Sequence, residues 1–214
     1  MARRGHTTKA EATRALLIDA ALKVIGRKGY AGASVDEIVR EAGVSKGVAY
    51  YHFRNKAAIA ASVLERGLGQ IIDGFEQAAK TAPTAAASLN AMINQFASMV
   101  FENEEFGRFF VTELWRNDRD WSEAMRSHET RLMKVLGSQL DRGKEEGLFR
   151  QDLNTGFVAV SLVGMVLTTA LFYTGAGAAP DARPLPMPDV DFPLLGKEEF
   201  VAAVVDFVRR ACAA

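Results

Sequence analysis

Apolar positions recur at helical spacing along almost the whole chain. Val35, Ile38, Val39 and Ala42 follow one another at steps of three and four residues, which places them on one face of a helix. No stretch alternates apolar and polar residues as a half-buried strand does, and there is no internal repeat. The sequence therefore predicts an all-α protein. The expected helices cover about 9–28, 35–42, 46–53, 56–80, 85–101, 105–115, 119–146, 157–173 and 197–211.

Two of these helices are joined by a very short turn. Ser34 and Glu37 have the spacing of a capping box, in which each side chain satisfies a free amide at a helix start. Gly43 is the residue expected just past a helix end, and Ser45 can cap the next helix. Two short helices joined in this way form a helix-turn-helix, whose second helix can enter a DNA major groove.

The second helix carries side chains suited to DNA. Serine and tyrosine hydroxyls, an imidazole and an ammonium group can donate to phosphate oxygens, whereas small residues let the backbone approach base edges. We assign base contacts to Lys46, Gly47, Val48 and Ala49. The phosphate contacts are assigned to Ser34, Ser45, Tyr50, Tyr51, His52 and Lys56. The alternative is a two-helix corner whose tyrosines only pack.

The segment GVSKGVAYYHFRNK at residues 43–56 resembles the recognition segment of TetR-family transcriptional regulators. The resemblance covers about residues 14–64, and a weaker one lies in EGLFRQDL at 146–153. Val48 and Ala49 replace the usual Thr-Leu or Thr-Ile, and Ala57-Ala58 replaces an acidic pair. The resemblance implies a three-helix DNA-binding domain followed by a larger helical domain that binds an effector and dimerises.

Charge is distributed unevenly along a chain whose formal net charge is zero. Residues 1–56 hold eleven Lys or Arg against five Asp or Glu, whereas residues 57–214 hold fifteen against twenty-one. A basic front and an acidic rear suit a protein whose N-terminal part meets a polyanion. We predict a DNA-binding domain over 1–55, with a basic arm at 1–9 that is either disordered or lies along DNA, and an effector-binding and dimerisation domain over 56–214.

Enzyme chemistry finds little support in the sequence. His6, His52 and His128 lie in no metal-binding spacing, and no nucleophile elbow, P-loop or dinucleotide fingerprint is present. Cys212 is the one cysteine, which excludes an intramolecular disulfide framework and suits a reducing cytoplasm. We expect a cytoplasmic protein that is not an enzyme and holds no metal or cofactor.

Residues 153–180 contain no charged residue, so a membrane helix has to be considered. The apolar part, 157–173, is short for a span, contains several polar residues and lacks a flanking basic cluster. A helix that packs on its own domain and on a partner gives the same pattern, so we favour a homodimer helix. The expected interface residues are Phe157, Ser161, Gly164, Thr168, Phe200, Val204 and Val208.

The C-terminal domain is rich in methionine and aromatic residues. Such residues usually form the core, but they are also adaptable pocket walls. The effector site is expected among Phe96, Met99, Phe110, Trp115, Trp121, Met125, His128, Met165 and Thr169. Residues 175–196 hold five of the six prolines, which predicts an irregular segment.

These features combine into a functional hypothesis. Two recognition helices of a homodimer would bind a palindromic DNA operator. A small apolar or amphipathic molecule in the C-terminal domain would release the DNA, as in a repressor. The alternatives are an activator and a DNA-binding dimer without an effector.

Overall fold

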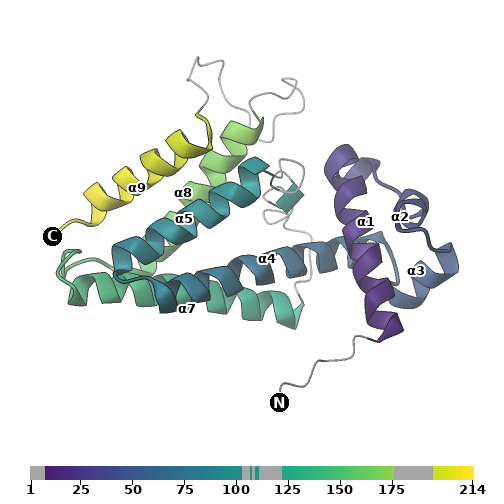
Figure 1. Ribbon diagram of the computed structural model, residues 1–214, viewed down its shortest axis with the longest axis horizontal. Helices are drawn as coiled ribbons and strands as arrows, with labels where there is room; N and C mark the ends of the chain where they lie inside the picture. The colour runs from purple at the N-terminus through teal and green to yellow at the C-terminus, as the bar shows by residue number, and fades with distance from the viewer. Residues whose placement is uncertain (1–7, 103–106, 108, 111–121, 176–194) are drawn as a thin grey trace. The chain divides into compact units, whose positions relative to one another are not determined.

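The computed structural model describes residues 8–102, 107, 109, 110, 122–175 and 195–214. Within them no strand occurs, and Phe149 and Ala213 form an isolated β-bridge. The all-α prediction is therefore confirmed. The helices, labelled in Figure 1, are α1 (Lys9–Gly32), α2 (Val35–Ala42), α3 (Lys46–His52), α4 (Lys56–Thr81), α5 (Ala85–Glu102), α7 (Glu123–Glu145), α8 (Thr155–Gly175) and α9 (Lys197–Cys212).

The chain divides into two compact units, Met1–Arg66 and Gly67–Ala214. The division falls inside α4, so this helix contributes its first turns to the N-terminal unit and the remainder to the C-terminal unit. The boundary that the sequence suggests at 55/56 marks the end of the helix-turn-helix and remains a prediction.

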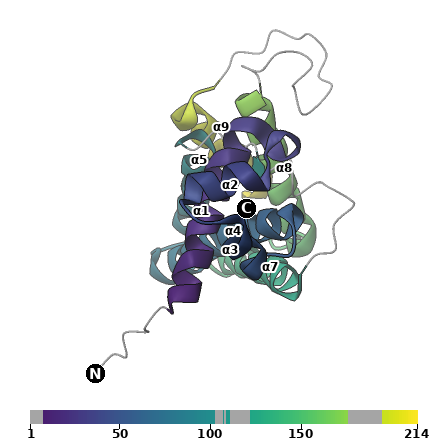
Figure 2. The same cartoon turned by 90° about the vertical axis from the view of Figure 1, so that its right-hand side faces the viewer.

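The N-terminal unit is built on α1, which packs against α2 and α3 (Figure 2). Leu17, Ile25 and Ile38 are fully buried between these helices, and Ile59 and Leu64 add buried side chains from α4. Removing such apolar surface from water is the main source of stability for so small a unit.

The predicted caps of the helix-turn-helix are present. Ser34 and Glu37 form both bonds of the capping box, and Gly43 takes the left-handed conformation at φ +67°. Ser45 accepts a hydrogen bond from the amide of Val48, and Asn55 caps α4 by accepting one from the amide of Ala58 at 2.9 Å. Local side-chain bonds therefore set both ends of the turn.

The end of α1 differs slightly from expectation. The sequence predicts that the helix ends at about residue 28, and Gly29 does leave the helical conformation, with φ +69° and ψ 166°. Only glycine takes this backbone geometry without steric cost. One more helical turn follows it, as far as Gly32.

In the C-terminal unit, α5 packs against α7, α8 and α9, and α7 also packs against α8 (Figure 1). The junction between α4 and α5 is tied to the end of α7. Glu146 accepts a hydrogen bond from the amide of Ala85 at 2.9 Å, and Arg142 donates one to the carbonyl of Pro83 at 2.8 Å.

Three expectations fall outside the described residues. These are most of the basic arm at 1–9, most of the helix expected at 105–115 and most of the proline-rich segment at 175–196. None of the described helices is long and apolar enough to cross a membrane.

Candidate nucleic-acid interface and effector cavity

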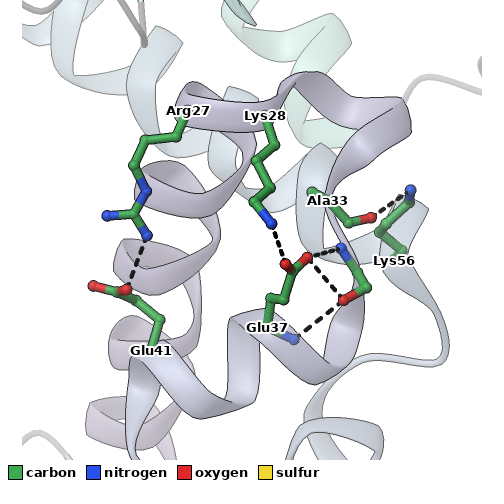
Figure 3. Close-up of polar contacts among 7 residues, drawn as sticks. Arg27, Lys28, Ala33, Glu37, Glu41 and Lys56 are labelled. Carbon is green, nitrogen blue, oxygen red and sulfur yellow. Dashed lines mark hydrogen bonds and ion pairs between the residues drawn. The ribbon is translucent and has the colours of Figure 1, made fainter.

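A polar network joins α1 to α2 behind the helix-turn-helix. Figure 3 shows Lys28 directed at Glu37 and Arg27 directed at Glu41. Glu37 also accepts hydrogen bonds from the amide and the hydroxyl of Ser34, at 3.1 and 2.9 Å. The hydrogen bond from Lys28, followed by those from Ser34, lowers the pKa of Glu37 to about 2. The carboxylate therefore stays ionised and fixes the start of α2.

One side of α3 is exposed and carries the predicted DNA-contacting groups. Tyr51 is 81% exposed and Tyr50 is 48% exposed, while Lys46 and Gly47 lie on the surface one turn earlier. A Cβ added at Gly47 would meet only an ordinary van der Waals contact, with the Ser45 hydroxyl at 3.9 Å. His52 is half-buried and meets the Tyr51 ring edge-on, with ring centroids 5.1 Å apart.

Two predicted DNA contacts need correction. Ala49 is 1% exposed and packs inside the unit, so its methyl group has no surface to offer a base. Lys56 directs its ammonium at three backbone carbonyls around the end of α1, those of Tyr30 (2.8 Å), Ala31 (3.4 Å) and Ala33 (2.9 Å; Figure 3). The ammonium group has three donors, and all are used in holding the fold.

The charged side chains of the helix-turn-helix differ in their availability. Lys46 pairs with Asp36 at 2.8 Å, and this hydrogen bond raises the pKa of Lys46. Both side chains are more than half exposed, so phosphate can compete for the lysine. Arg40 and Arg54 are exposed, and neither has an acidic partner within the described residues. They are candidate phosphate contacts that our site assignment omitted, although their charge was visible in the sequence.

The C-terminal unit contains an apolar cavity of about 320 Å³ walled mainly by α4, α5, α7 and α8, with Phe110 and Val208 of α9 adding to the wall. Among the described residues that line it, Glu129 is the one with a charged or hydrogen-bonding side chain. The volume lies at the lower end of the range for small-molecule sites. The apolar wall includes Leu68, Ile71, Phe75, Met92, Phe96 and Leu132.

The sequence located this cavity only in part. Phe96 and Phe110 line it as predicted, whereas Met99, Met125, His128, Met165 and Thr169 are absent from its wall. The hydroxyl of Thr169 donates to the carbonyl of Met165 at 2.7 Å, one turn back in α8, so its proton is already engaged. Trp115 and Trp121 lie outside the described residues.

Two polar side chains lie directly against glycines of α4. The ring of His128 is 3.3 Å from the position that a Cβ of Gly69 would occupy, and its Nδ1 is buried without a hydrogen-bond partner. Gln95 covers Gly74 and donates to the carbonyl of Ile71 at 3.2 Å. His128 thus packs on α4 and is not among the residues that line the cavity.

The predicted dimer residues fall into two groups. In α8, Phe157 is 72% exposed, Ser161 and Thr168 are on the surface, and Gly164 has open space around it. In α9, the three predicted contacts point inward and are at most 6% exposed in the single chain, which corrects their assignment, because a core side chain has no surface to give a partner. These three are Phe200, Val204 and Val208.

Comparison with known proteins matches both units to one family. The family described as "Bacterial regulatory proteins, tetR family" matches residues 17–63, and "Tetracyclin repressor-like, C-terminal domain" matches residues 86–173. The chain belongs to the tetR family of bacterial regulatory proteins. The exposed α3 and the capped helix-turn-helix give this tetR-family member the DNA-binding part of a transcriptional regulator.

Several relatives are named as regulators. The "Fatty acid metabolism regulator protein" of Bacillus subtilis is 25% identical over 150 residues, covering 70% of this chain and 77% of the relative. The "HTH-type transcriptional activator FasR" of Mycolicibacterium smegmatis is 33% identical over 116 residues, about half of each chain (52% and 53%).

Solved structures share the tetR-family fold over nearly the whole chain. FadR from Bacillus subtilis in complex with stearoyl-CoA has a TM-score of 0.71 at 22% identity, over 89% of this chain and 97% of that one. AibR in complex with isovaleryl coenzyme A and operator DNA has a TM-score of 0.68 at 16% identity, over 91% and 97%. At this level of identity the likeness establishes the fold.

Proposed function

We propose that this tetR-family regulator is a homodimeric repressor that leaves a palindromic operator when a molecule with a hydrocarbon chain binds the C-terminal cavity. Such a regulator acts in the cytoplasm, where bacterial chromosomal DNA is located. The observation that carries the proposal is the apolar cavity, because its wall offers surface to a hydrocarbon chain and almost none to a polar ligand.

The relatives and solved neighbours support a ligand that carries a fatty acyl chain. The name of the Bacillus subtilis relative refers to fatty acid metabolism, and two solved neighbours were determined with stearoyl-CoA and isovaleryl coenzyme A. An acyl chain would gain about 0.8 kcal/mol for each methylene group that it buries. A cavity at the lower end of the usual volume range suits one chain of moderate length.

The wall of the cavity offers a route to the DNA. Leu68, Ile71 and Phe75 of α4 line the cavity, and earlier residues of the same helix, such as Ile59, belong to the core of the N-terminal unit. A ligand that fits one position of α4 better than another would shift the population of DNA-binding states. The shift is limited by the difference between its affinities for the two states.

In the operator complex, α3 of each protomer would enter a major groove, with the two half-sites roughly 34–36 Å apart. Tyr50 and Tyr51 would donate to phosphates, together with Ser34, Ser45 and His52. Lys46 and the backbone at Gly47 would approach base edges, with Val48 half-buried beside them. We propose Arg40 and Arg54 as additional phosphate contacts.

The homodimer would use the exposed apolar side chains of the last two helices. Phe157 and Val160 of α8 are 72% and 62% exposed, and Phe207 of α9 is 59% exposed. Adjacent exposed apolar side chains can form the kind of patch that marks a contact surface, and Phe157 and Val160 lie one turn apart on α8. Phe207 replaces the buried α9 residues in our proposed interface, alongside Ser161, Gly164 and Thr168.

The test begins with selection of DNA fragments by the purified full-length protein. A recovered palindrome is then titrated in fluorescence anisotropy with and without a series of acyl-CoA thioesters of increasing chain length. We expect at least one thioester to weaken operator binding. A selected operator whose affinity no chain-bearing compound alters would support the alternative, a DNA-binding dimer without an effector.

Activation is a second candidate output, and the name of the FasR relative favours it. A promoter fused to the recovered operator distinguishes the two, because deletion of the regulator raises expression under a repressor and lowers it under an activator.

A further inference from the structure

Glu129 occupies a special place in the cavity wall. It is the charged residue among the described lining residues, and it is exposed to solvent, so it lies where the cavity opens. Within the described part of the chain, its carboxylate has no hydrogen-bond or ion-pair partner. The neighbouring Arg131 is already engaged by Glu76 at 2.9 Å and Asp73 at 2.6 Å, and it does not neutralise Glu129.

The rest of the wall decides where the polar end of a ligand can lie. Apart from Glu129, the described lining residues have apolar side chains or are glycine, so none of them can pair with a charged or polar group of a ligand. Burying an ionised or strongly polar group without a partner costs several kcal/mol. A chain-bearing ligand therefore puts its chain inside and leaves its polar end at the opening, beside Glu129.

We infer that Glu129 selects the head group of the ligand: the cavity takes a single hydrocarbon chain whose polar end is uncharged or cationic, and it disfavours a free carboxylate. A second carboxylate beside Glu129 would meet like-charge repulsion, an uncharged ester, thioester or amide would not, and a cation would be attracted. This inference rests on the proposed function, because it assigns the head group of a ligand in that same cavity.

A head-group preference of this kind distinguishes two ligands that carry the same acyl chain. A free fatty acid carries its charge at the end of the chain, next to Glu129. An acyl thioester carries an uncharged linkage there, and the phosphates of coenzyme A are held away by the uncharged pantetheine arm. Glu129 thus favours the activated form of an acyl chain over the free acid.

The test uses three probes with the same decyl chain: decanoate, N-methyl decanamide and decyltrimethylammonium. Their affinities for the full-length wild type, Glu129→Gln and Glu145→Gln are measured by isothermal titration calorimetry at neutral pH and low salt. Glu129 is exposed, so its substitution leaves the fold intact. Glu145 lies on the same helix, is exposed and is absent from the cavity wall, which makes it a matched control.

We expect wild type to bind the amide and the cation more tightly than decanoate. In Glu129→Gln, decanoate should gain about fivefold in affinity and the cation should lose about fivefold, as for a charge pair roughly 4 Å apart in water. The amide should not change, and Glu145→Gln should behave as wild type.

Three outcomes overturn the inference, and they differ in what they say about the proposed function. Binding of all three probes with a head-group order that is the same in wild type and Glu129→Gln removes the role of Glu129 but keeps the cavity as the ligand site. Failure of all three to bind removes both. Tightest binding of decanoate to wild type also rejects the head-group preference.

Discussion

At the scale of single residues, a side chain's role depends on which of its atoms are already engaged. Tyr51 and Lys56 both looked like phosphate contacts in the sequence. Tyr51 leaves 81% of its surface free, whereas the Lys56 ammonium is bonded to carbonyls at the end of α1. A hydrogen-bond donor is therefore available to DNA in the case of Tyr51, whereas the fold already uses the donors of Lys56.

We expect Tyr51→Phe to weaken operator binding several-fold without lowering stability, because it removes one exposed phosphate donor and no internal contact. Anisotropy with a set of single-base operator variants provides the measurement. The loss should be similar for every variant. A loss confined to one base position would show that Tyr51 reads a base.

Lys56→Met should lower the free energy of unfolding by about 1.5–3 kcal/mol, the range for hydrogen bonds that involve a charged group. Urea denaturation followed by circular dichroism measures this change. The same substitution at Lys9, which is exposed and has no acidic partner within the described residues, is the control. Unchanged stability in Lys56→Met would return Lys56 to the list of phosphate contacts.

Glu37→Gln tests the network behind the helix-turn-helix through pH. The pKa of Glu37 is lowered from 4.5 to about 2 in the fold, so its stabilising contribution is present above pH 4.5 and is lost as the pH falls toward 2. The variant should therefore be less stable than wild type at neutral pH. The difference should shrink on acidification below pH 4.5. The measurement is the urea midpoint of both proteins as a function of pH. A difference between wild type and variant that stays constant with pH would contradict this linkage.

At the scale of helices, the ends were predictable and the buried faces were less so. Ser34, Gly43 and Asn55 act within a few residues of the backbone groups that they satisfy, so their pattern is readable along the chain. The inward direction of Phe200 in α9 is set by α5, since the two helices pack together and the Phe200 ring lies 5.3 Å from that of Phe101. No local signal carries that information.

Two glycines of α7 provide a matched pair for helix packing. A Cβ at Gly143 would lie 2.1 Å from the buried Phe149 ring, whereas a Cβ at Gly137 would meet its nearest atom, in Thr155, at an ordinary 3.7 Å. Gly143→Ala should destabilise the protein by about 1–3 kcal/mol through overpacking. Gly137→Ala should stabilise it by up to about 1 kcal/mol through helix propensity. Thermal denaturation of both variants checks the contrast, and a Gly143→Ala variant as stable as wild type would contradict it.

At the scale of the whole molecule, the proposed switch needs two copies of the chain and a connection between cavity and DNA. The connection is α4, which contributes to both compact units. The exposed apolar side chains of α8 and α9 are the surface available for a second copy.

Light scattering should give a mass of twice 23.3 kDa for the wild type at micromolar concentration. Phe157→Asp should shift the protein toward the monomer and weaken operator binding, because a charge would be placed in an apolar contact. Leu148→Asp, at another exposed apolar position, is the control. A wild-type monomer, or a dimer unaffected by Phe157→Asp, would contradict the proposed interface.

The sequence by itself determined the all-helical fold, the capped helix-turn-helix and the family, because helical periodicity, capping and the recognition motif are expressed by residues close together in the chain. Only the tertiary structure decided which apolar residues surround a cavity. Phe96 lines it and Met125 does not, although both are apolar residues on helices. It also decided that Ala49 and Lys56 serve the fold. Burial and hydrogen-bond partners depend on residues distant in sequence, so equal chemistry gave unequal roles.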